Sequence, residues 1–148
     1  LQGARITAYE AARAGMPYTL LTDSAAGSLF TAGEVDAVLV GADRIAADGS
    51  TANKIGSYPL AVLAAYHHVP FIVVAPTTSV DLATPDGSAI EVEQRPANEV
   101  TDLAPSPLGT QAYNPAFDVT PPELITAIVT ENGVVAPVTA DRLAAVCG

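Results

Sequence analysis

Residues Val40–Ala64 read VGADRIAADGSTANKIGSYPLAVLA and place a polar segment between two apolar ones. The run VDAVLVGA (Val35–Ala42) leads into it, and valine-rich runs that are apolar on both faces are typical of buried parallel strands. The stretch YPLAVLAAYHH that follows has apolar residues at helical spacing. The segment therefore predicts a strand, a loop and a helix, with Asp43 at the first junction and Asn53 and Lys54 at the second.

Strand and helix signals alternate along the rest of the chain. PFIVVAP predicts a second buried strand, YTLLT and AIEVE predict short ones, and VVAPV predicts a last strand. The alternation predicts an α/β, Rossmann-like fold with a mainly parallel sheet and flanking helices, as a single domain over residues 1–148. The predicted helices cover Ala4–Ala14, Ala25–Glu34, a segment after Asn53, Thr120–Gly133 and Thr139–Cys147.

The helix expected over Thr120–Gly133 has the fullest set of local signals. Thr120 suits the N-cap, Pro121 the first helical position, and Glu123 completes a capping box. Gly133 suits the stop. The Pro-containing segment Gln94–Asp118 is too long for an ordinary connection, so we expect it to have a packing or binding role.

Composition limits the class of protein. Of the 148 residues, 49% are hydrophobic and 15% charged, which is typical of a globular domain with its own core. No apolar run approaches the ~20 residues of a membrane span, and no signal peptide is visible. A net charge of −10 argues against nucleic-acid binding through a basic face. The only cysteine, Cys147, precludes an internal disulfide, and a cytoplasmic protein is expected.

Asp43 is the strongest candidate for chemistry. In open α/β sheets ligands bind outside the carboxyl ends of the strands, and Asp43 follows such a strand. A carboxylate leaving a buried strand is partly desolvated, which suits acid/base work. The alternative is a structural role, in which Asp43 caps the loop or pairs with Arg44.

Lys54 and Asn53 form the second candidate group. At a helix start they would hold an anion with help from free backbone N–H groups. The alternative for Lys54 is a solvated surface side chain. The chain has neither GxxxxGK[ST] nor GxGxxG, so it supports no P-loop and no dinucleotide fingerprint. His67 and His68 point about 100° apart on a helix and cannot share a metal, so no metal or cofactor is expected.

These motifs resemble a known family. The Val40–Ala64 segment is similar to the central motif of methylthioribose-1-phosphate isomerases, within a larger family that includes regulatory subunits of initiation factor 2B and ribose-1,5-bisphosphate isomerases. LQGARITAYE, IEVEQRPANEVT and NPAFDVTPPELITAIVTENGVV resemble further family segments. Arg44 in GADR and the last block resemble the isomerase branch more than the initiation-factor subunits.

The resemblance implies an intramolecular oxidoreductase of methionine salvage. Its substrate would be the phosphorylated sugar 5-methylthioribose 1-phosphate, with no nucleic-acid or membrane partner. Asp43 matches the family's catalytic Asp, and Gln2, Asn53 and Lys54 match its substrate contacts. The family's cysteine motif and Arg-Gly-Ala phosphate loop lie N-terminal to Leu1, so we expect a C-terminal domain that is inactive alone. A cytoplasmic homodimer is also implied.

Two alternatives and two departures remain. A regulatory module akin to the initiation-factor subunits, or a ribose-1,5-bisphosphate isomerase, would have the same fold. Pro59 stands where the family has a small polar residue, and its ring would clash with a preceding helical turn, so the helix is expected to begin near Ser57. Ser24 replaces an Asn of the family pattern.

Overall fold

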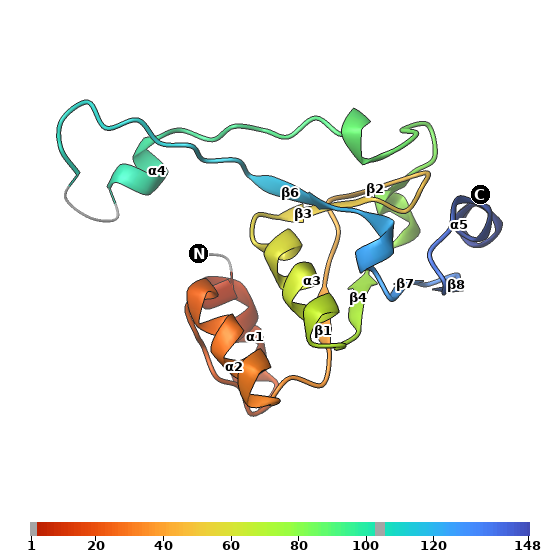
Figure 1. Cartoon of the computed structure of the whole chain (residues 1–148), viewed down its shortest axis with the longest axis horizontal. Helices are drawn as coiled ribbons and strands as arrows, with labels where there is room; N and C mark the ends of the chain where they lie inside the picture. Colours follow the sequence, from red (N-terminus) through yellow and green to blue (C-terminus); the bar gives the residue numbers. More distant parts are fainter. Residues whose placement is uncertain (1–2, 103–105) are drawn as a thin grey trace.

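The computed structural model describes residues 3–102 and 106–148 and arranges the strands in two four-stranded sheets, which we call sheet A and sheet B (Figure 1). Sheet A contains the strands expected from the aliphatic runs. Three of its strands are parallel, and the fourth closes an antiparallel hairpin at the edge. In spatial order they are β1 (Val38–Val40), β4 (Phe71–Val74), β7 (Ala127–Thr130) and β8 (Gly133–Val135).

Sheet B was not expected from the sequence. It is mixed, because β3 pairs antiparallel with both of its neighbours, whereas β2 and β5 are parallel. The polar segment after Asp43, which we predicted to be a loop, forms the β2–β3 hairpin. In spatial order the strands are β5 (Val80–Asp81), β2 (Arg44–Ala46), β3 (Thr51–Lys54) and β6 (Phe117–Thr120).

The helices are short. α3 begins at Ser57, as predicted, and Pro59 falls in its first turn, where a missing N–H is tolerated. No helix among the described residues has the length and apolar character needed to cross a membrane. The helices are η1 (Gly3–Thr7), α1 (Ala8–Arg13), η2 (Asp23–Ala25), α2 (Ala26–Ala32), α3 (Ser57–Tyr66), η3 (Thr77–Ser79), η4 (Gly87–Ala89), α4 (Asn98–Thr101), η5 (Pro122–Leu124) and α5 (Ala140–Cys147).

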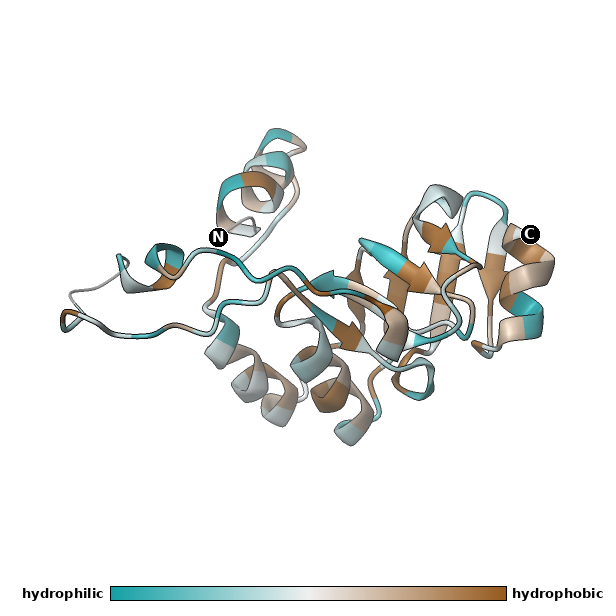
Figure 2. Ribbon diagram, turned by 90° about the horizontal axis from the view of Figure 1, so that it is seen from above, coloured by the Kyte–Doolittle hydropathy of each residue, from teal (hydrophilic) through white to brown (hydrophobic). Residues whose placement is uncertain are grey.

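One face of sheet A forms the core. The register aligns Val73, Ile128 and Val135, which are buried against α3, α2 and α5. Figure 2 shows hydrophobic colour concentrated in these strands and in the helices beside them. The residues of the opposite face are more accessible, because Leu39 and Val134 are 66% and 60% exposed.

The helix predicted over Thr120–Gly133 is wrong. Its first part is the single 3-10 turn η5, and the remainder forms the β7–β8 hairpin. The run after Leu124 is rich in β-branched residues, and β7 pairs along its length with β4. This tertiary pairing outweighs the local capping signals. The short strands predicted for YTLLT and AIEVE are also absent.

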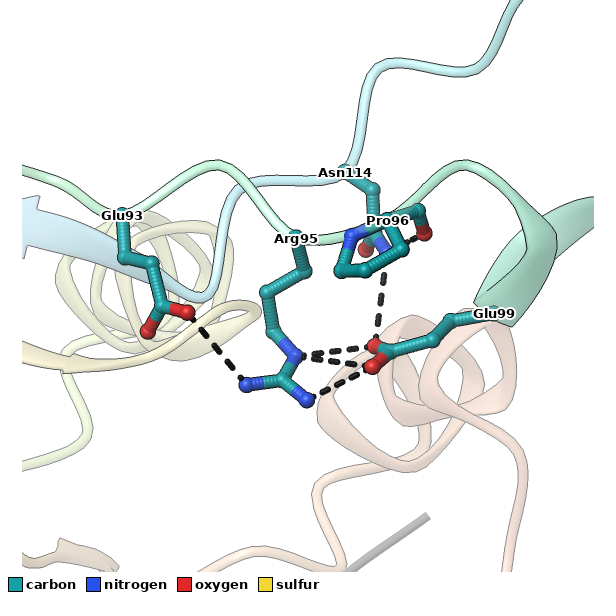
Figure 3. A network of polar contacts seen from close by, with 5 residues as sticks. All are labelled: Glu93, Arg95, Pro96, Glu99 and Asn114. Atoms are coloured by element: carbon teal, nitrogen blue, oxygen red, sulfur yellow. Dashed lines mark hydrogen bonds and ion pairs between the residues drawn. The ribbon is translucent and has the colours of Figure 1, made fainter.

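The long Pro-containing segment forms an arm (residues 90–102 and 106–116) that extends from the body in Figure 1. Its two limbs are tied by Arg95 N–H to Asn114 O at 2.8 Å and Ala116 N–H to Glu93 O at 2.9 Å. Near its far end, Arg95 binds both carboxylate oxygens of Glu99 (Figure 3). Apart from α4 and one isolated β-bridge between Gln94 and Pro115, the described part of the arm is irregular.

Candidate functional site

The short link Gly41–Asp43 joins the two sheets. β1 of sheet A ends at Val40 and β2 of sheet B begins at Arg44. The link is held from both sides, because Asp43 N–H donates to Ala52 O at 2.9 Å and Ser79 Oγ donates to Ala42 O at 3.2 Å. Asp43 thus lies at the carboxyl end of a parallel strand, where this architecture places ligands.

The carboxylate of Asp43 is available for chemistry. Its side chain is exposed, so the partial burial that we expected is wrong. Arg44 pairs instead with Asp81 at 3.4 Å, and no described residue forms an ion pair with Asp43. The pKa of Asp81 is lowered first by the hydrogen bond from the Thr84 hydroxyl, then by the Ala83 N–H and then by the charge of Arg44. The alternative role for Asp43 as the partner of Arg44 is therefore not observed.

Asn53 lies in β3 and not at the start of a helix, which corrects the sequence-based placement of Asn53 and Lys54. Its Nδ2 donates to Ser57 Oγ at 2.8 Å, and Ser57 Oγ donates to Lys54 O at 2.9 Å. Its Oδ1 lies toward the link, 4.0 Å from the position that a Cβ on Gly41 would occupy. Asn53 therefore lies close to the segment that carries Asp43.

Lys54 takes a different direction, because successive side chains of a strand point to opposite faces. Its Nζ lies 4.8 Å from the centroid of the Phe117 ring, in the cross-strand pair with that residue. Lys54 is half-buried, and its charge is the last of several causes that lower the pKa of Glu99 in the arm, the first being the hydrogen bond from Arg95. It is thus not a fully solvated lysine.

The start of α3 already holds an anion. The Asp118 carboxylate accepts from Gly56 N–H at 2.7 Å and from Tyr58 N–H at 3.1 Å. The expectation that these N–H groups are free for a ligand is therefore wrong. The sequence did not indicate Asp118 as the cap, because it lies 62 residues after Gly56 in the chain. Its position opposite Asn53 in the β3–β6 register is a tertiary feature.

The remaining candidates add little to this site. Gln2 lies outside the described residues. An apolar groove between α2, α3 and β1 is lined by residues including Leu29, Val38 and Leu60, and it does not reach Asp43, Asn53 or Lys54. Within residues 3–102 and 106–148, no cluster of three His, Cys, Asp or Glu side chains is placed to hold a metal ion.

The chain matches a described family of proteins over most of its length. The Initiation factor 2 subunit family matches residues 1–137, and the chain belongs to this family. It is 62% identical over 148 residues to a methylthioribose-1-phosphate isomerase of Anaeromyxobacter sp. (strain Fw109-5), covering 98% of this chain and 44% of that protein. It is 56% identical over 140 residues to the Chloroflexus aurantiacus (strain ATCC 29366 / DSM 635 / J-10-fl) protein of the same name, covering 93% of this chain and 40% of that protein.

Two solved structures share the fold. The 5-methylthioribose 1-phosphate isomerase of Pyrococcus horikoshii OT3 superposes with a TM-score of 0.93 at 44% identity, over 98% of this chain and 41% of that one. The translation initiation factor eIF-2B subunit delta of A. fulgidus superposes with a TM-score of 0.88 at 40% identity, over 96% of this chain and 43% of that one. The chain thus spans less than half the length of each of these relatives.

Proposed function

We propose that the chain is the C-terminal, Rossmann-like domain of a methylthioribose-1-phosphate isomerase. The observation that carries the proposal is the 62% identity across 98% of the chain to a protein of that name. The reaction would convert 5-methylthioribose 1-phosphate to 5-methylthioribulose 1-phosphate in methionine salvage. The family resemblance alone supports a homodimer in the cytoplasm.

Asp43 is the acid/base group of this proposal. C1 of the substrate is locked in a phosphate-bearing hemiacetal, so ring opening needs a proton donor before a hydrogen moves between C2 and C1. A carboxyl group within hydrogen-bond reach can provide and remove such protons. The exposed position of Asp43 at the end of β1, with no ion-pair partner among the described residues, supports this role.

The other proposed contacts are Asn53, Lys54 and Gln2. Lys54 provides a positive charge for the phosphate, which the overall charge of −10 would otherwise repel. Cys147, which lies in α5 and packs against the core, falls outside the family's cysteine motif and is not part of the proposed site. We therefore propose that the family's cysteine is provided by a part of the protein outside this chain. No cofactor enters the proposal.

A regulatory module is the second candidate, and the likeness to the A. fulgidus initiation-factor subunit favours it. This subunit is 40% identical to the chain, whereas the Anaeromyxobacter and Chloroflexus isomerases are 62% and 56% identical to it. The rival predicts binding without turnover, so an activity assay separates the two.

The test compares the protein expressed from its complete reading frame with the 148-residue chain alone. We expect ketose formation from methylthioribose 1-phosphate by the full-length protein and none by the isolated chain, although circular dichroism should show that the chain is folded. Ribose 1,5-bisphosphate tests the related isomerase. A full-length protein that turns over neither sugar would refute the proposal, and an active isolated chain would refute the assignment of half the site to a missing domain.

A further inference from the structure

Lys54 is a charged group without a carboxylate partner. The chain has 16 Asp and Glu against six Lys and Arg, so a basic side chain is expected to pair with one of the many acids. Arg44 and Arg95 do so, whereas no ion pair of Lys54 forms within residues 3–102 and 106–148. Lys54 is also half-buried, so water surrounds it only in part. Something other than an opposite charge therefore holds its ammonium in place.

The neighbour of this ammonium is an aromatic ring. Nζ of Lys54 lies over the ring of Phe117, 4.8 Å from its centroid, and the two residues are paired across β3 and β6. A cation within about 6 Å of a ring centroid is attracted by the negative face of the ring. A ring carries no formal charge, so it localises the ammonium without neutralising it. A carboxylate in the same place would have to be displaced before an anion could bind.

The position of the ring is set by sheet B. Phe117 is half-buried at the start of β6, and the residue on each side of it is tied to the segment just after β3. Ile55 N–H donates to Ala116 O at 3.1 Å, and Gly56 N–H donates to the Asp118 carboxylate at 2.7 Å. The backbone that carries Phe117 is thus fixed on both sides, which limits the movement of the ring.

The acid that interacts electrostatically with Lys54 is bound by another residue. Arg95 donates to Glu99 from Nη2 to Oε1 at 2.6 Å and from Nε to Oε2 at 2.8 Å (Figure 3). The hydrogen bond from Arg95 is the largest cause of the lowered pKa of Glu99, and the charge of Lys54 makes a smaller contribution. Arg95 therefore keeps this carboxylate from neutralising the ammonium of Lys54.

We propose that Phe117 is a positioning residue, whose ring holds the ammonium of Lys54 in one place and leaves its full charge available to an anion. The inference rests on the proposed isomerase function, in which Lys54 meets the phosphate, and it adds a residue that has no part in that proposal. Without the ring, the flexible lysine side chain has to be ordered by the ligand itself, and the acids of a chain with a net charge of −10 compete for it. Both effects weaken the binding of a phosphate.

The test measures kcat and KM for methylthioribose 1-phosphate, and the inhibition constant of inorganic phosphate, in the full-length protein. Phe117→Leu keeps an apolar side chain and removes the ring. We expect it to raise the KM and the phosphate inhibition constant about three- to tenfold, as for the loss of a partly exposed cation–π contact, with a much smaller change in kcat. Phe117→Tyr keeps a ring face, so both constants should stay near the wild-type values.

Phe30→Leu is the matched control. Phe30 is 4% exposed in the core, and its ring lies 5.6 Å from that of His67. The substitution removes the same kind of ring from the same domain. We therefore expect a lower melting temperature, with an unchanged KM and an unchanged phosphate inhibition constant.

NMR of the Lys54 side chain tests the contact itself. In full-length protein with isotope-labelled lysine, the signal of Lys54 is the one that disappears in Lys54→Arg. Protons over the face of an aromatic ring are shifted upfield, so the Cε protons of Lys54 should lie upfield of an ordinary lysine in the wild type and in Phe117→Tyr. In Phe117→Leu they should move to the ordinary lysine position.

The outcomes separate the inference from the function on which it rests. A wild type without isomerase activity would overturn the proposed function, and the Lys54 signal would still decide whether the ring holds the ammonium. A Lys54 signal or a phosphate inhibition constant that does not change in Phe117→Leu would overturn the inference alone. Effects of equal size in Phe30→Leu or in Phe117→Tyr would also overturn it, because the ring of Phe117 would then have no specific role.

Discussion

Sheet A and sheet B differ in the kind of side chain that they contain. The buried face of sheet A is aliphatic, with Val73, Ile128 and Val135 in one row. Sheet B carries polar residues, and Asn53 lies opposite Asp118 within it. The difference indicates that sheet A provides most of the aliphatic core, to which Ile45 of sheet B also belongs, and that sheet B presents the polar groups.

The largest effect should come from the link itself. We expect Asp43→Asn in the full-length protein to lower turnover by about 10²–10⁴-fold, the usual contribution of a positioned acid or base. The melting temperature should stay near the wild-type value because the Asp43 side chain is exposed. Near-normal turnover in this variant would remove Asp43 from the mechanism. It would also argue against a functional role for the link between the two sheets.

A core substitution in sheet A should act on stability. Ile128 is fully buried, so Ile128→Ala should reduce the free energy of unfolding by about 2–5 kcal/mol. Val134→Ala is the control. Val134 lies in the neighbouring strand β8 and is 60% exposed, so this substitution should lower the free energy of unfolding much less. Urea denaturation of the isolated chain measures both changes, and equal losses would show that the outer face of sheet A is as tightly packed as the core.

Asp118 should affect both stability and binding. Asp118→Asn removes the charge at the start of α3, and we expect a loss of about 0.5–2 kcal/mol, typical of an N-terminal cap. Thr139→Ala removes the cap of α5, where Thr139 Oγ1 accepts from Arg142 N–H at 3.4 Å. Both variants should have a lower melting temperature than the wild type, but only Asp118→Asn should raise the KM for the sugar phosphate. A matching rise in Thr139→Ala would mean that general destabilisation explains it.

The smallest effect concerns the pH dependence of the Arg95–Glu99 ion pair in the arm, which belongs to neither sheet. The hydrogen bond from Arg95, and then its charge, holds the pKa of Glu99 below its ordinary value. The Arg95–Glu99 ion pair is therefore fully formed above the pKa of Glu99 in the unfolded chain, about 4.3. It is lost as the pH falls through the lower pKa of Glu99 in the folded chain. The NMR shift of the Asn114 side-chain amide, which lies 3.5 Å from Glu99, reports this change. An identical titration in Arg95→Gln would contradict the assignment.

The sequence predicted most of sheet A and little of sheet B. Continuous aliphatic runs identify β1 and β4, and Pro59 located the start of α3, because these signals are local. β2 and β3 are short and polar, and they are stable only through partners elsewhere in the chain. Residues 120–133 had helical capping signals, but β7 within this stretch pairs with β4 and forms a hairpin with β8.

The candidate site was predictable in part for the same reason. Asp43 could be placed because it directly follows a recognisable strand. The direction of Lys54 and the cap at Asp118 could not, since each depends on β6, which comes more than sixty residues after β3. Sequence patterns within a window of about 18 residues cannot contain such a contact.

The Asp118 cap also sets the order in which this region can fold during synthesis. Gly56 and Asp118 are 62 residues apart, so β3 and the start of α3 leave the ribosome well before the carboxylate that completes them. At about 5–20 residues per second, roughly 3–12 s separate the two events. During that interval the nascent chain has β3 without its β6 partner, and the helix N–H groups are hydrated. The Asn53 region therefore reaches its final form only after Asp118 has been added to the chain.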